Sequence, residues 1–137
     1  MTRTTSADAW NPTACERGSG PAEFVLVGGL LTLLTLAVLQ LGLAVYVRNV
    51  VHDAAVEGAH YAALADSDRA RGIDRTREVI GRAVGEQYAD DVTAAYGATG
   101  GVPSVTVTVR AVLPLIGLIG VPQAMEVGAS APVESLP

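Results

Sequence analysis

The longest hydrophobic segment of the chain covers residues 24–47, which contain no charged side chain. As a helix rising ~1.5 Å per residue it would be ~36 Å long, enough to cross a hydrocarbon core of ~30 Å. The alternative is a buried core helix. The roughly 90 residues that follow are too few to surround a helix that is apolar on every side. The pattern therefore predicts a transmembrane helix over residues 24–47.

Helical sequence continues beyond this segment and predicts one N-terminal helix over residues 19–65. Residues 48–65 contain no proline and six alanines, which favour helix. Asp66, Ser67 and Asp68 then offer N-cap side chains for a second, amphipathic helix. Its predicted apolar stripe consists of Ile73, Ile80, Val84, Tyr88, Val92 and Tyr96, with Gly97 as the terminator and Glu78–Arg82 as an i,i+4 ion pair on the charged side.

Alternating apolar and polar positions predict a C-terminal β-hairpin. Residues 105–113 alternate valine, alanine and leucine with threonine and arginine, and residues 125–131 alternate again as the partner strand. A loop is expected at Gly100, Gly101 and Pro103. The fold class is thus α+β: a leader at 1–18, the long helix at 19–65, and a small extracytoplasmic domain at 66–137 that contains the second helix and the hairpin.

Composition and charge exclude several classes of function. Half of the 137 residues are hydrophobic, the net charge is −5, and the nine basic residues are scattered arginines, which argues against a nucleic-acid partner. The single cysteine, Cys15, cannot form an intramolecular disulfide or a cysteine-ligated zinc site. The sequence contains no nucleophile elbow, P-loop or dinucleotide fingerprint, so neither catalysis nor a cofactor is expected.

Two further segments have open interpretations. Asp53, Glu57 and His60 share one side of the first helix near His52, which suits a metal site, although a solvated helix face is the preferred interpretation and no metal is expected. Residues 113–121, LPLIGLIGV, are too short and too interrupted to span a membrane. They are expected to form the hairpin loop, which either contacts a partner or the outer membrane surface or closes the domain core.

The entrance to the long helix carries a spaced motif. Gly18 is followed five positions later by Glu23 and then by Phe24, the first residue of the apolar segment. A local explanation is available, because Pro21 suits a first helical turn and Glu23 can complement the positive end of the helix dipole. A cleavable signal peptide with its site near the AALA sequence at residues 62–65 is another alternative, although the apolar segment is longer than the usual 7 to 15 residues.

The spacing of Gly18, Glu23 and Phe24 before a long apolar helix resembles the class III signal of type IV pilin-like proteins. Together with the VTVTVRAVLP sequence near the end, the layout from Arg17 to about Ser135 resembles the TadE-like minor pseudopilins of tight-adherence pilus systems. The resemblance implies that a prepilin peptidase cuts between Gly18 and Ser19. It also implies that Glu23, then the fifth residue, pairs with the N-terminal ammonium of a neighbouring subunit.

The same resemblance implies the partners and the location. Expected partners are the prepilin peptidase, other pilins or pseudopilins through the N-terminal helix, pilus assembly platform proteins and membrane lipid. Arg3 and Arg17 on the leader side outweigh Arg48 on the other side, which places the N-terminus in the cytoplasm and the C-terminal domain outside it, anchored in the cell membrane or carried in a surface pilus. Two features depart from the family pattern: Pro21 is third in the would-be mature chain, and the leader has no net positive charge.

Two other functions remain open at this point. The chain could be a signal-anchored cell-envelope protein that is never incorporated into a filament, or a membrane-bound enzyme or metal-binding domain. The Gly18 and Glu23 spacing favours the pseudopilin interpretation.

Overall fold

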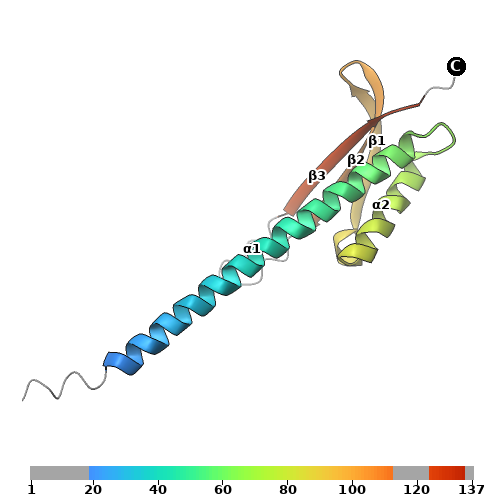
Figure 1. The fold of residues 1–137 in the computed structure, drawn as a ribbon. Helices are drawn as coiled ribbons and strands as arrows, with labels where there is room; N and C mark the ends of the chain where they lie inside the picture. The colour runs from blue at the N-terminus through green and yellow to red at the C-terminus, as the bar shows by residue number, and fades with distance from the viewer. Residues whose placement is uncertain (1–18, 113–123, 135–137) are drawn as a thin grey trace, which may run out of the picture. The chain divides into compact units, whose positions relative to one another are not determined.

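The structure, a computed structural model, describes residues 19–112 and 124–134 (Figure 1). The predicted leader and the apolar loop at 113–121 lie outside these residues. The elements in chain order are helix α1 (Ser19–Ala63), helix α2 (Arg69–Ala83), a 3₁₀ turn η3 (Glu86–Tyr88), and strands β1 (Asp91–Thr99), β2 (Val102–Val112) and β3 (Ala124–Pro132). The predicted α+β class, with a long N-terminal helix before a second helix and a sheet, is confirmed.

The chain divides into two compact units, residues 1–38 and residues 39–137. In the second unit the later part of α1 and the whole of α2 lie on one face of an antiparallel sheet of order β1-β2-β3 (Figure 1). Strand alternation decides which residues face the helices. Val105, Val107 and Val109 of β2 are fully buried, whereas Thr106, Thr108 and Arg110 between them are not.

The helical side of this core consists mainly of small residues. Val47 and Val51 are 2% and 0% exposed, and they are followed on the same side of α1 by a series of buried alanines: Ala54, Ala55, Ala59, Ala62 and Ala63. Because alanine has only a methyl group, the helix backbone can lie close to the valines of the sheet. The α1 residues from 47 onward are therefore part of the domain core.

α1 and α2 are closest where two glycines meet. A Cβ placed on Gly58 would lie 2.7 Å from the Gly72 carbonyl oxygen and would overlap the Thr76 hydroxyl, and a Cβ on Gly72 would lie 2.5 Å from that of Ala62. The Thr76 hydroxyl is buried and donates to the Gly72 carbonyl at 2.9 Å, so its polar group is satisfied. Glycine is thus required at 58 and 72 by packing.

The predicted start of the second helix is confirmed. Asp68 is the N-cap of α2, and its carboxylate accepts a hydrogen bond from the Arg71 backbone N–H at 3.0 Å.

The predicted extent of the second helix is wrong. α2 ends at Ala83 instead of continuing to Gly97, and Gly85 adopts a φ of +112°, which side-chain-bearing residues rarely adopt. Residues 91–99 form strand β1, whose nine residues pair with β2 from Asp91–Arg110 to Thr99–Val102. The four-residue spacing of Val92 and Tyr96 suits a helix but is also compatible with strand alternation. Pairing with β2 decided in favour of the strand.

The predicted hairpin is confirmed as β2 and β3, which pair from Ser104–Pro132 to Val112–Ala124. Strand β1 extends it to three strands. Gly100 and Gly101 form the β1–β2 turn with φ values of +62° and +82°, as the expected loop requires. Pro103, expected in that loop, is instead the second residue of β2.

The glycine contact between the helices predicts that a larger residue at position 58 lowers the stability of the protein. Gly58→Ala should lower the free energy of unfolding of the full chain in detergent micelles by about 1–3 kcal/mol, because the added methyl overlaps Thr76 and the α2 backbone. Gly42→Ala is the matched control, since its Cβ would meet nothing within 4 Å. Denaturant unfolding measures both. Equal stability of the two variants would contradict the close helix contact.

Candidate functional site

The motif at the helix entrance lies at the start of α1. The helix begins at Ser19, and Gly18 lies outside the described residues. Pro21 lies in the first turn, where backbone N–H groups have no helical acceptor and proline is tolerated. Glu23 lies beyond that turn, which contains no acidic residue. Because the helix-dipole effect falls off within the first turn, it is a weaker explanation for Glu23 than the sequence suggested.

The Glu23 side chain is exposed, and no residue in the described ranges forms an ion pair or hydrogen bond with it. The next side chain, Phe24, is 79% exposed. An acid at the edge of an apolar surface is therefore available to a group from outside this chain.

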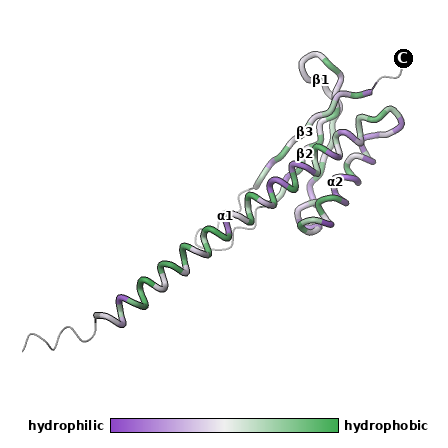
Figure 2. Tube along the Cα trace, in the orientation of Figure 1, coloured by the Kyte–Doolittle hydropathy of each residue, from purple (hydrophilic) through white to green (hydrophobic). Residues whose placement is uncertain are grey.

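The surface of the following turns of α1 is apolar and uncovered. Val25 and Leu26 are 71% and 70% exposed, and none of the most apolar 18-residue window, of mean hydropathy 2.3, is buried. Figure 2 shows the hydrophobic colour continuing along this part of the helix. A core helix would hide these side chains from solvent, so the core-helix alternative does not apply. Length and exposure indicate a single-pass membrane anchor.

The few polar groups in this segment suit an apolar environment. Thr32 and Thr35 donate their hydroxyls to the carbonyl oxygens of Gly28 and Leu31, each at 2.8 Å. These bonds remove two hydroxyl donors from the helix surface. Gly28 has open space where a Cβ would lie, so no contact within the described chain requires glycine there.

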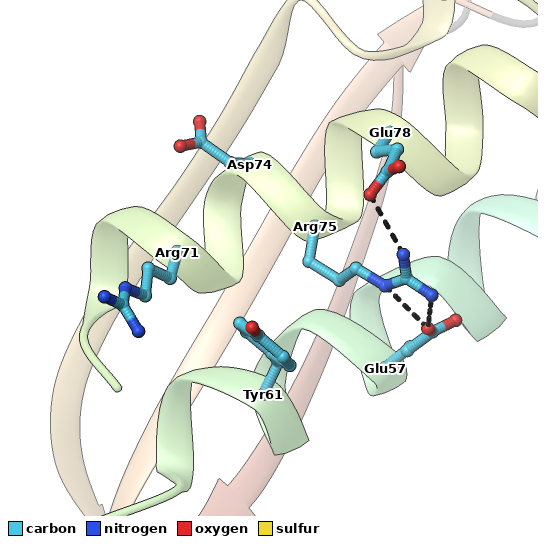
Figure 3. A pocket seen from close by; sticks show the side chains of 6 residues that line it. All are labelled: Glu57, Tyr61, Arg71, Asp74, Arg75 and Glu78. Atoms are coloured by element: carbon cyan, nitrogen blue, oxygen red, sulfur yellow. Dashed lines mark hydrogen bonds and ion pairs between the residues drawn. The ribbon is translucent and has the colours of Figure 1, made fainter. Parts of the chain in front are cut away.

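A polar hollow on the domain surface lies between the two helices (Figure 3). It has a volume of about 620 Å³ and is lined by Glu57 and Tyr61 of α1 and by Arg71, Asp74, Arg75 and Glu78 of α2. Arg75 donates from Nε and Nη2 to Glu57 Oε1, at 2.8 and 2.6 Å, and from Nη1 to Glu78 Oε2 at 2.9 Å.

These hydrogen bonds favour the charged form of Arg75. The hydrogen bond with Glu57, and after it that with Glu78, raises the pKa of Arg75 above its ordinary value. Arg82 adds a second ion pair to Glu78 at 2.5 Å, which confirms the predicted i,i+4 pair. Glu57 and Glu78 are thus paired with arginines, and the Glu57–Arg75 pair joins α1 to α2.

Glu57 also belongs to the possible metal-binding face of the first helix. Glu57 binds Arg75, and in residues 19–112 and 124–134 no group of three or more His, Cys, Asp or Glu side chains is placed to hold a metal ion. The Glu57–Arg75 pair joins residues 18 positions apart on two helices. Spacing along the sequence does not predict this pair. The sequence shows only that the two helices carry opposite charges.

Comparison with known proteins covers the segment that contains the motif. No curated protein matches the chain, and no solved structure matches it. A family model described as TadE-like protein matches residues 18–60, from the glycine of the motif through the membrane segment and into the domain part of α1. The resemblance found in the sequence is therefore confirmed over residues 18–60, and this part of the chain is TadE-like.

Proposed function

We propose that the protein is a membrane-anchored minor pseudopilin that takes part in assembling a tight-adherence pilus. The observation that carries the proposal is the TadE-like match over residues 18–60, which includes Gly18, Glu23 and the uncovered apolar surface of α1. TadE-like proteins are components of pilus structure and assembly. The protein would accordingly act through contacts with other subunits and assembly platform proteins rather than through catalysis.

Processing by a prepilin peptidase is the first step of the proposed pathway. Cleavage between Gly18 and Ser19 would leave a mature chain whose first residue is also the first residue of α1. Removal of the leader would create an ammonium group at that helix end. Pro21 would then be the third residue, within a first turn that needs no N–H from it.

Glu23 has a specific part in the proposed assembly. An N-terminal ammonium and a carboxylate at the lipid boundary are each costly to leave unpaired. Pairing Glu23 of one subunit with the new N-terminus of its neighbour would satisfy both charges and set the offset between the two helices. The exposed apolar surface beyond Phe24 would supply the remaining contact.

The proposed cleavage between Gly18 and Ser19 predicts the N-terminus of the mature protein. Protein extracted from its own membrane should begin at Ser19, by intact mass and N-terminal sequencing. An intact Met1 in cells that make the peptidase would contradict the pseudopilin assignment. A start near residue 65 would indicate an ordinary signal peptide instead.

The proposed orientation in the membrane places residues 49–137 outside the cytoplasm. Asp66→Cys, in a Cys15→Ser background, places a thiol at an exposed position after α1. This thiol should react with a membrane-impermeant reagent in whole cells, because the arginine balance keeps the leader side inside. Labelling that requires cell lysis would reverse the assignment.

We expect the charge of Glu23 to be needed for pilus assembly but not for membrane insertion. Glu23→Gln keeps the shape of the side chain but leaves the neighbour's ammonium, with an ordinary pKa of ~7.7–8.0, without its partner near lipid. The variant should remain in the membrane and be cleaved, yet pili and co-purification of pilus proteins should fall by tenfold or more, a change of about 1.4 kcal/mol or more in assembly.

Glu23→Asp is the matched control, since it retains the charge and should retain part of the assembly. Normal pili in Glu23→Gln would favour the signal-anchored envelope protein, which needs no charge at this position.

A further inference from the structure

A second hollow lies where α1 leaves its apolar segment. It has a volume of about 370 Å³ and is lined by Arg48, Asn49 and His52 of α1 and by Glu126, Val127 and Gly128 of β3. Arg48 is the first charged residue after the apolar segment. The hollow therefore begins at the first charged residue beyond the apolar segment.

The depth of this hollow matches the headgroup layer of a bilayer. Total bilayer thickness of about 40–45 Å and a hydrocarbon core of about 30 Å leave roughly 5–7 Å of headgroup region on each side. At ~1.5 Å per residue, Arg48 lies ~1.5 Å and His52 ~7.5 Å along α1 from Val47. The two side chains thus cover the level at which lipid phosphates lie.

An apolar track leads to the hollow along α1. Leu41, Val45, Arg48 and His52 follow a spacing of i, i+4, i+7 and i+11, which places them on one side of the helix. Leu41 is 65% exposed and Val45 51% exposed. A lipid with its headgroup in the hollow would have its acyl chain beside these two side chains.

The hollow contains separated charges of both signs. Among the described residues Arg48 forms no ion pair or side-chain hydrogen bond, and in particular none with Glu126. Glu126 accepts from Arg110 through Oε2 at 2.9 Å, and no described residue donates to its other oxygen. A cation and an anion that line one recess without pairing suit a ligand that itself carries both charges.

We propose that this hollow binds the headgroup of an aminophospholipid, with phosphatidylethanolamine as the type. Its phosphate accepts hydrogen bonds from Arg48, assisted by Asn49 and His52, and its ammonium donates to Glu126. Phosphatidylglycerol would satisfy Arg48 but would leave Glu126 beside an uncharged glycerol. Bound lipid would hold β3 at the membrane surface. The site goes beyond pilus assembly and requires only that α1 be inserted.

Native mass spectrometry of the full chain, released from micelles containing equal amounts of phosphatidylethanolamine and phosphatidylglycerol, tests the site. The unmodified chain should retain more phosphatidylethanolamine. Arg48→Gln should lower retention of both lipids by about three- to tenfold, the scale of one charge-assisted hydrogen bond at a partly exposed site. Glu126→Gln should lower retention of phosphatidylethanolamine alone. Arg48→Gln also removes a cation from the outer side, so it does not work against the expected topology.

Two variants control for general charge effects. Arg71→Gln and Glu134→Gln remove the same charges at exposed positions that do not line this hollow, and both should retain lipid like the unmodified chain. Equal losses in these controls would overturn the proposal. So would equal retention of the two lipids by the unmodified chain, or an unchanged lipid ratio in Glu126→Gln.

Soluble glycerophosphoethanolamine separates a lipid site from a site for the free headgroup. It lacks the acyl chains that would lie beside Leu41 and Val45, so it should not displace bound phosphatidylethanolamine at equal concentration. Displacement at equal concentration would assign the hollow to the soluble headgroup and overturn the lipid proposal. Because purified chain is used, the outcome is independent of whether the cell assembles pili.

Discussion

The packing of the small-residue side of α1 against the valine face of the sheet is the contact on which the domain depends. Three strands and one 15-residue helix bury little surface by themselves, and Val105, Val107 and Val109 would face water without α1. Alanines let the helix cover these valines, and Gly58 with Gly72 lets α2 lie close to α1. The later part of α1 is therefore a necessary part of the domain core.

One helix consequently has two different surroundings. Between residues 24 and 43 most of its side chains are aliphatic and exposed, as expected where lipid takes the place of protein neighbours. From Val47 onward one side is small and buried, whereas Arg48, His52 and Glu57 are exposed. No proline lies between the two parts of the helix.

Two kinds of charged site lie along α1. In the hollow between α1 and α2, Arg75 is shared between Glu57 and Glu78, and these pairs serve the helix contact. At the two ends of the apolar segment, Glu23 and Arg48 have no partner among the described residues. Unpaired charge at a lipid boundary is costly, which is why subunit and lipid contacts are most reasonably sought at these ends.

The sequence by itself determined the features that depend on neighbouring residues. The apolar length of α1, the Asp68 cap, the Glu78–Arg82 pair, the Gly100–Gly101 turn and the alternation of β2 and β3 all follow from local spacing. The entrance motif, Gly18 with Glu23, is local as well, and residues 18–60 match the family it suggested.

Only the tertiary structure decided the features that join distant residues. Residues 91–99 became a strand because β2 offered a paired edge, although their apolar spacing also suited a helix. The Glu57–Arg75 bridge and the recess shared by Arg48 and Glu126 exist because α2 and β3 return alongside α1. Periodicity reports which side of its own element a residue occupies, whereas the partner on that side is set by how the chain packs upon itself.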